Sequence, residues 1–337
     1  MRNNLFEEMF FALGVNLAWL DNQYDHDFGK NEIMGYDFRA YDEEEHKSNM
    51  DAYLKDISLM GTRVVRLWLF ERFEGLKFDE DGNVKGVDDG LLDNIADVLN
   101  TAKKYDLHIY LCLMDTWGVS VQSQENLPRL NAMIVKEETR KSFIENALKA
   151  LVSDSRIKNS KLFAIDVMNE PEGLYTSIWR KEIEWSDVIS FITDCTSSIH
   201  DNSNFKVSCG FQQYQTLIDS KDELNDLDFY DYHEYNDDGL LLPYSNLGLT
   251  KPCIIGECGQ KSERYDDKIY DRTIKQFLKN AWKNGYAGCL VWNYNYKGYD
   301  SNDSNNRHSL IKSDGSWRNA CNSLVSFSRK HRKHMLL

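Results

Sequence analysis

The sequence lacks the features that mark several large classes of protein. No apolar run approaches the length that a helix needs to span a bilayer. The apolar stretch near the N-terminus follows Glu7 and Glu8 instead of the basic region of a signal peptide. Neither a G-x-G-x-x-G nor a G-x-x-x-x-G-K loop is present. These absences argue against a membrane protein and against a nucleotide-dependent oxidoreductase or transferase.

The sequence also lacks a C-x-x-C pair, so it predicts neither a zinc site nor a disulfide framework. Its seven cysteines are odd in number and scattered, mostly within apolar runs. We expect them to be buried thiols of a protein in a reducing compartment. The predicted location is therefore cytoplasmic, or secreted if a leader precedes this sequence in the natural protein.

Basic residues are fewer than acidic ones, with 40 Lys and Arg against 54 Asp and Glu. The formal net charge is −14 and the sequence pI is about 5.1. An acidic surface repels phosphate backbones and anionic membranes, so nucleic acid and membrane are not expected partners. Hydrophobic residues make up 42% of the 337 residues, which is enough for a large core. The composition leaves the oligomeric state open.

What the sequence does contain is an alternation of short apolar runs with amphipathic stretches. The apolar runs predict eight strands: Phe11–Trp19, Arg63–Phe70, His108–Met114, Leu162–Met168, Phe205–Gly210, Leu227–His233, Cys253–Gly256 and Ala287–Asn293. The amphipathic stretches predict helices at Glu45–Met60, Leu91–Tyr105, Glu138–Val152, Trp185–His200, Asp271–Asn284 and Trp317–Lys330.

This alternation, without a repeat, linker or low-complexity segment, indicates one α/β domain. We predict a (β/α)8 TIM barrel that forms a single catalytic domain over residues 1–337. Continuous apolar strands such as CIIG (253–256) suit parallel strands covered on both faces. A doubly wound open sheet has the same alternation, but the missing phosphate loop and the count of eight strands favour the barrel.

In such a barrel the loops that follow the strands form the active face. The loop after the first strand is long and rich in Asp, Asn, Tyr and Gly (21–45), and the loop after the third strand runs from 115 to about 136. Their aromatic and amide side chains suit the walls of a groove for sugars. The adjacent Asp-His-Asp at 25–27 lacks a defined ligand spacing, and we predict no metal.

Two glutamates directly end apolar strands. Glu170 follows LFAIDVM as Asn-Glu-Pro, and Glu257 follows CIIG as Gly-Glu-Cys. Splitting an acetal between sugars needs one protonated carboxyl to help the leaving oxygen and one ionised carboxyl to attack or to activate water. The two carboxyls must lie in different environments so that their pKa values differ. Glutamates at the ends of the fourth and seventh strands meet this need.

Four segments together resemble the clan A glycoside hydrolases, most closely the family five cellulase and mannanase type. They are AIDVMNEPE (164–172), HEY (233–235), IIGECG (254–259) and LVWNYN (290–295). The resemblance implies that Glu170 is the acid/base and Glu257 the nucleophile of a retaining enzyme. It also implies that Asn169 holds the 2-hydroxyl of the substrate, an interaction that strengthens in the oxocarbenium-like transition state.

The resemblance assigns supporting roles to four more residues. Tyr235 would hydrogen-bond the nucleophile, and His233 matches the histidine of the same His-x-Tyr motif. Arg66 matches the arginine of the second strand, which lowers the pKa of Glu257 and fixes its geometry. Trp292 matches the tryptophan of the last strand, which stacks on the sugar ring as the floor of the subsite.

One segment departs from the family pattern. Family members often have a histidine at the end of the third strand, where this chain has Asp115, followed by Trp117. We expect Asp115 and Trp117 to support substrate binding, with Asp115 either replacing the polar contact or marking a different hydroxyl pattern. The sugar and the linkage are therefore not fixed by the resemblance.

The function we predict is that of a retaining O-glycosyl hydrolase, which cleaves β-linked hexosides by double displacement and needs no cofactor. Its substrates would be β-glucan, β-mannan or oligosaccharides derived from them. The alternative is a carbohydrate-binding barrel that has lost turnover. The two long loops, if they close one end of the groove, favour exo action on short oligosaccharides, so endo and exo action both stay open.

Overall fold

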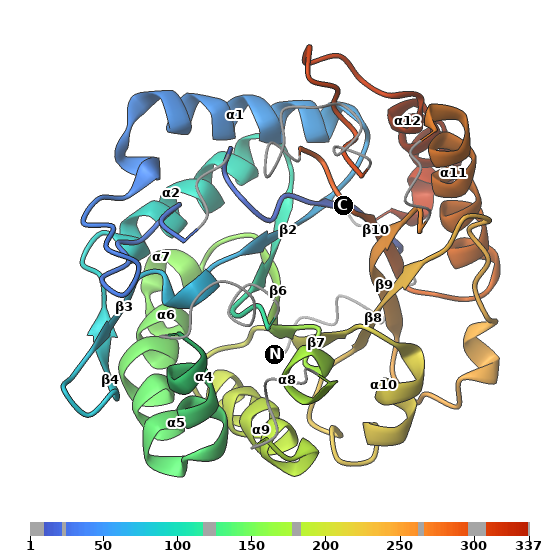
Figure 1. Ribbon diagram of the computed structural model, residues 1–337. Coiled ribbons are helices and arrows are strands. Elements are labelled where there is room, and N and C mark those ends of the chain that lie inside the picture. The colour runs from blue at the N-terminus through green and yellow to red at the C-terminus, as the bar shows by residue number, and fades with distance from the viewer. Residues whose placement is uncertain are drawn as a thin grey trace.

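The computed structural model describes residues 10–21, 25–116, 126–176, 183–261, 266–295 and 308–335. Eight parallel strands close into a barrel in the order β1-β10-β9-β8-β7-β6-β5-β2, and helices surround them (Figure 1). The barrel strands are β1 (Ala12–Asn16), β2 (Val64–Trp68), β5 (His108–Cys112), β6 (Leu162–Asn169), β7 (Val207–Phe211), β8 (Tyr230–Tyr235), β9 (Cys253–Gly259) and β10 (Gly288–Val291). The predicted (β/α)8 fold class is confirmed.

The longer helices on the outside of the barrel match the predicted amphipathic stretches. They are α1 (Glu44–Leu59), α2 (Leu91–Lys104), α9 (Trp185–Asn202), α11 (Asp267–Lys283) and α12 (Asn319–His331). The predicted helix at Glu138–Val152 is a run of α5 (Glu137–Phe143), a π-helical turn (Ile144–Leu148) and α6 (Lys149–Ser153). The short helices are α4 (Asn126–Val135), α7 (Ser155–Lys158), α8 (Glu172–Thr176) and α10 (Tyr214–Ser220).

Helix α11 illustrates how local sequence sets the bounds of an element. Asp266 is its N-cap, and its carboxylate accepts hydrogen bonds from the backbone N–H of Lys268 at 2.8 Å and of Ile269 at 3.1 Å. The chain leaves the helix near Gly285, whose φ of +87° favours glycine. The predicted start at Asp271 was therefore one turn late, because the capping aspartate lies outside the apolar periodicity.

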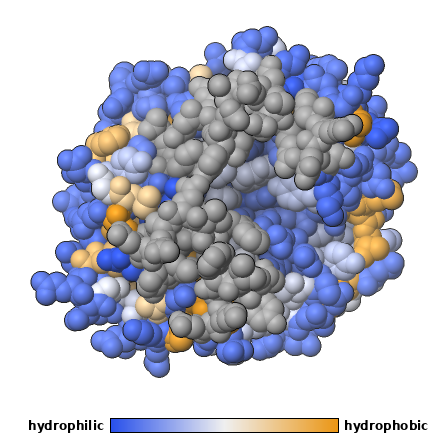
Figure 2. All heavy atoms as spheres, viewed as in Figure 1, coloured by the Kyte–Doolittle hydropathy of each residue, from blue (hydrophilic) through white to orange (hydrophobic). Residues whose placement is uncertain are grey.

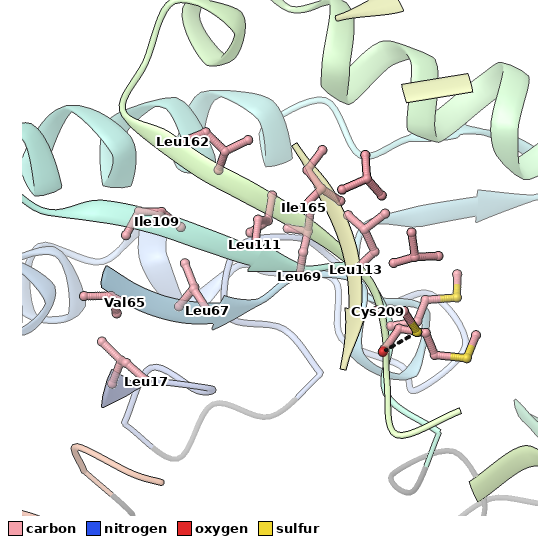
Figure 3. Close-up of a cluster of buried hydrophobic side chains, with 14 of the residues drawn as sticks. Leu17, Val65, Leu67, Leu69, Ile109, Leu111, Leu113, Leu162, Ile165 and Cys209 are labelled. Atoms are coloured by element: carbon pink, nitrogen blue, oxygen red, sulfur yellow. Dashed lines mark hydrogen bonds between the residues drawn. The ribbon is translucent and has the colours of Figure 1, made fainter. Parts of the chain in front are cut away.

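Alternate residues of each strand face opposite sides of the barrel wall. Outward-facing residues such as Leu67, Leu111 and Ile165 pack in the main core cluster (Figure 3). The same cluster includes apolar residues of the surrounding helices. A separate buried cluster contains Val64 of β2 with residues of the other strands, and it fills the barrel interior. Val64 and Arg66 are two residues apart in β2, so both side chains face the barrel interior. Arg66 lies nearer to the carboxyl ends of the strands.

Several connections differ from the prediction. A two-stranded hairpin, β3 (Leu76–Phe78) with β4 (Val84–Val87), lies between β2 and α2. Helix α4 occupies part of the predicted long loop after the third barrel strand. The connection from β8 to β9, for which the sequence predicts no helix, contains a 3-10 turn (Tyr244–Asn246). These elements are too short for a periodic pattern to reveal them.

The expectation of buried thiols is borne out. All seven cysteines are free and buried. Within the described ranges, no helix is both long and apolar enough to cross a bilayer.

Candidate active site

Glu170 directly follows β6, at the edge of the barrel where the carboxyl ends of the strands meet. Its backbone φ is +46°, in the left-handed region that residues other than glycine rarely adopt. The Glu170 N–H donates to the Gly210 carbonyl at 2.7 Å, and the Glu170 carbonyl accepts from Thr116 Oγ1 at 2.6 Å. These bonds hold an unfavourable backbone conformation that aims the carboxyl at the site.

Glu257 lies within β9 and is 4% exposed. Its Oε1 accepts from Arg66 Nη1 at 2.7 Å, and its Oε2 accepts from Tyr235 Oη at 2.6 Å. Burial raises the pKa of Glu257, while the nearby His233 and Arg66 and the hydrogen bond from Tyr235 oppose that rise. The predicted lowering of the pKa by Arg66 is present, but desolvation outweighs it.

The Tyr235 hydroxyl is a dependable donor to Glu257. Burial and the neighbouring charge of Glu257 raise the pKa of Tyr235 well above its usual value. The phenol therefore stays protonated over the whole neutral range and always offers its hydrogen to the carboxylate.

His233 lies between the two glutamates. Its Nδ1 is 2.8 Å from Glu170 Oε1 and 3.6 Å from Glu257 Oε2. Burial lowers the pKa of His233 to about 4, so the ring is neutral at pH 7. The structure gives His233 a hydrogen bond to Glu170 and only a longer contact to Glu257.

Arg66 is fully buried and connects several strands. Besides Glu257, its guanidinium donates to Asp166 Oδ2 from Nε at 3.0 Å and from Nη2 at 2.7 Å, and to Asn16 Oδ1 from Nη1 at 3.1 Å. A buried guanidinium needs compensating charge and acceptors, and these provide it. The predicted position of Arg66 beside Glu257 is confirmed.

Sequence reasoning missed Asp166, although a signal was available. It is an aspartate within an otherwise apolar strand, just as Arg66 is an arginine within one. Its second oxygen, Oδ1, accepts from the backbone N–H of Gly210 at 3.0 Å and of Met168 at 3.1 Å. Asp166 therefore holds Arg66 in one orientation and leaves Nη1 free to reach Glu257.

Asn169 and Asp115 form a pair beside the glutamates. Asn169 Nδ2 donates to Asp115 Oδ1 at 2.9 Å, and Asn169 Oδ1 accepts from Arg66 Nη2 at 2.8 Å. The end of the third barrel strand also bridges to β6 at these two residues. The aspartate that departs from the family pattern thus orients the amide of Asn169.

Trp292 follows β10 and belongs to a cluster of three tryptophans. Its ring centroid is 5.8 Å from that of Trp19 and 5.7 Å from that of Trp68, and the latter two are 5.3 Å apart. Trp19 and Trp292 are half-buried, whereas Trp68 is 7% exposed. Sequence reasoning identified Trp292 and missed the other two: Trp68 is the last residue of β2, and Trp19 lies in the loop just after β1. Trp117 lies outside the described residues.

Two further polar residues, Gln212 and Glu172, belong to the surroundings of Glu170. Gln212 Nε2 donates to Glu170 Oε2 at 3.3 Å, and Glu172 accepts hydrogen bonds from the backbone of the same loop after β7. Glu172 stands within the Asn-Glu-Pro-Glu motif, so its position was visible in the sequence. Gln212 carries no sequence signal, because its contact depends on how β7 sits beside β6.

The residues of the site bring two carboxyls and an imidazole together. Among the described residues, Glu170, His233 and Glu257 each offer one ligand atom, and these atoms lie within 4.8 Å of one another. That spacing would admit a cation, but Arg66 and Tyr235 already bind both oxygens of Glu257. The space-filling view shows a largely hydrophilic face with a hollow near its centre (Figure 2).

Comparison with known proteins gives two relatives by sequence. The chain is 26% identical over 329 residues to a mannan endo-1,4-beta-mannosidase of Mytilus edulis, with 84% of this chain and 83% of the relative covered. It is 25% identical over 341 residues to a mannan endo-1,4-beta-mannosidase of Cryptopygus antarcticus, with 87% and 82% covered. No family model matches the chain.

Solved structures agree on the fold. The beta-1,4-mannanase from the common sea hare Aplysia kurodai superimposes with a TM-score of 0.72 at 22% identity, over 97% of this chain and 95% of the other. The beta-mannanase from the blue mussel Mytilus edulis gives a TM-score of 0.70 at 21% identity, over 97% and 94%. The sequence relatives support a glycosidase, and together with the closed barrel and the two strand-end glutamates they fit the resemblance to clan A glycoside hydrolases of the family five mannanase type.

Proposed function

We propose that this enzyme is an endo-acting β-1,4-mannan hydrolase that retains the configuration of the anomeric carbon. The observation that carries the mechanism is the short separation of the two carboxyls: one carboxylate oxygen of Glu170 lies within 4.8 Å of one carboxylate oxygen of Glu257. Retaining enzymes hold the two carboxyls about 5–5.5 Å apart, whereas inverting enzymes need roughly 6.5–9.5 Å to admit a water molecule.

The choice of mannan rests on the relatives. Both curated sequence relatives are named mannan endo-1,4-beta-mannosidases, and their alignments span more than four fifths of this chain. Their names also favour endo action over the exo action that long loops would suggest. The other outcome of the sequence analysis, a binding barrel without turnover, is not favoured, because both glutamates are present with hydrogen-bond partners.

In the proposed reaction Glu257 is the nucleophile. Hydrogen bonds from Arg66 and Tyr235 fix its two oxygens and stabilise its negative charge, which supports this role. The carboxylate attacks the anomeric carbon and forms a covalent glycosyl-enzyme. As the ester forms, charge leaves Glu257, and Arg66 remains paired with Asp166.

Glu170 is the acid/base in this proposal. It gives its proton to the oxygen of the departing sugar in the first step, and it takes a proton from the water that hydrolyses the glycosyl-enzyme in the second. The contact with neutral His233 supports this role, because an uncharged imidazole does not lock the carboxyl in its ionised form.

The remaining residues form the sugar subsite. Asn169 is held by Arg66 and Asp115 in a fixed orientation, which supports its assignment to the 2-hydroxyl. In mannose this hydroxyl is axial, so an amide of fixed orientation bears directly on the choice between mannose and glucose. Trp292, backed by Trp19 and Trp68, provides an aromatic face for the sugar ring.

The test is hydrolysis of β-1,4-mannan and defined mannooligosaccharides, with β-1,4-glucan as the comparison. We expect internal cleavage of mannan, with the β-anomer of the new reducing end appearing first in proton NMR. Glu257→Gln should abolish turnover, and Glu170→Gln should slow hydrolysis of oligosaccharides by about 10²–10⁴-fold. Initial release of the α-anomer, or near-normal turnover by Glu257→Gln, would refute the mechanism. A preference for glucan would refute the substrate.

A further inference from the structure

The geometry points to Glu172 as a positioning residue for the acid/base, acting through the loop that carries Gln212. This inference rests on the proposed role of Glu170. The two glutamates are separated by one proline in the sequence, but their carboxyls have different surroundings. Glu170 faces the site, whereas Glu172 faces the loop that follows β7.

Glu172 is bound to the backbone of that loop. Its Oε2 accepts from the Gln212 N–H at 2.9 Å, and its Oε1 accepts from the Gln213 N–H at 3.1 Å. Glu172 is 3% exposed. A carboxylate that receives two adjacent N–H groups in a buried place fixes both peptide units, and such charge-assisted bonds are about twice as strong as neutral ones.

The peptide that Glu172 fixes carries the side chain that touches Glu170. Gln212 Nε2 donates to Glu170 Oε2 at 3.3 Å, while His233 Nδ1 contacts Glu170 Oε1 at 2.8 Å. One contact at each oxygen prevents rotation of the carboxyl about its last bond. Glu172 thereby sets the plane in which Glu170 presents its proton to the leaving oxygen.

Glu170 and Glu172 are two acidic side chains close to each other, so the charges around them matter. Glu170 faces His233 and Tyr235 from β8 and Glu257 from β9, and it repels Glu172 electrostatically. An acidic side chain so close to another acid is unfavourable unless its contacts outweigh the repulsion. The two backbone N–H groups from the loop after β7 supply those contacts to Glu172.

The test uses the dependence of the rate on the leaving group. Acid assistance matters for a sugar leaving group, and it matters little for 2,4-dinitrophenolate, which departs without a proton. We expect Glu172→Gln to lower kcat/KM for mannotetraose by about 10-fold, a part of the 10²–10⁴-fold that a general acid contributes. For 2,4-dinitrophenyl β-mannoside the first step should change less than twofold.

Gln212→Ala supplies an independent variant. It removes the amide that touches Glu170 but keeps the backbone N–H groups that Glu172 binds. We expect it to show the same selective loss, and the double variant to lose no more than the larger single loss, because both act through one contact. Glu223→Gln, the same chemical change at an exposed position before β8, is the matched control and should leave both substrates unaffected.

Equal losses on both substrates in Glu172→Gln would overturn the inference, since a purely structural role slows every reaction alike. If Glu172→Gln does not fold, an unselective effect or no effect in Gln212→Ala overturns it instead. Both of these outcomes contradict only the role of Glu172, and they do not contradict the proposed function as long as the wild type cleaves mannan. Absence of hydrolysis by the wild type would instead contradict the proposed function.

Discussion

Glu74 offers a quantitative test of the loops that frame the site. It follows a 3-10 turn after β2, and its Oε1 accepts from the backbone N–H of Phe28 at 2.5 Å and of Gly29 at 2.6 Å. It therefore ties the loop after β2 to the loop after β1. Burial raises the pKa of Glu74 to about 8. The backbone hydrogen bonds oppose this rise, and the nearby charge of Asp25 adds to it. Glu74 is 2% exposed.

The sign of the pH effect follows from proton binding. The pKa is about 8 in the folded state against 4.5 for a free glutamate. Between these values the folded protein binds a proton that the unfolded chain has released, so the free energy of unfolding falls as the pH rises. The stabilisation is complete below pH 4.5 and is lost above pH 8. The difference between the two pKa values corresponds to at most about 5 kcal/mol.

Glu74→Gln removes this titration and keeps an oxygen that can accept from the loop amides. We expect the variant and the wild type to have similar unfolding free energies at pH 5. At pH 9 the variant should be more stable by several kcal/mol, up to the limit of about 5 kcal/mol. The pKa values of Asp27 and Glu71 are also raised by burial, so some pH dependence remains in the variant.

Urea unfolding at pH 5, 7 and 9, followed by tryptophan fluorescence, measures these free energies. Glu80→Gln, at an exposed position in the hairpin that follows, is the matched control and should show the wild-type pH dependence. A Glu74→Gln variant with the wild-type slope, or one that is less stable than the wild type at pH 9, would refute the reasoning.

Two further predictions concern stability elsewhere in the barrel. Asp166→Asn should lower the free energy of unfolding by about 3–5 kcal/mol and reduce kcat, because it leaves the buried guanidinium of Arg66 without its main partner; a loss below about 1 kcal/mol in urea unfolding would argue against that pairing. Asp266→Ala should cost about 1 kcal/mol by removing the N-cap of α11, with unchanged kcat/KM. A large loss of activity in Asp266→Ala would show that α11 influences the site beyond its packing.

Local sequence was sufficient to locate the two glutamates and the strands that carry them. A buried parallel strand is apolar along its whole length, so CIIG and LFAIDVM stand out, and a carboxyl at the end of such a strand lies at the active face of a barrel. Arg66 was placed beside Glu257 by the resemblance to the family. Periodicity and burial are properties of a single segment, and they can be read without knowing its neighbours.

Tertiary structure decided which side chains meet. His233 contacts Glu170 more closely than Glu257, and Asp115 holds Asn169, although all five lie at the ends of strands identified from the sequence. The outcome depends on the relative shift of neighbouring strands in the closed barrel, where β8 and β9 change register between Tyr232 and His233. No single segment encodes that shift.

The sequence by itself therefore determined the fold, the reaction class and the position of both carboxyls. Only the tertiary structure showed how each carboxyl is held: Arg66 shared between Asp166 and Glu257, and Gln212 brought to Glu170 by a loop that Glu172 fixes. The physical reason is distance along the chain. Arg66 and Glu257 are 191 residues apart, and barrel closure alone brings them into contact.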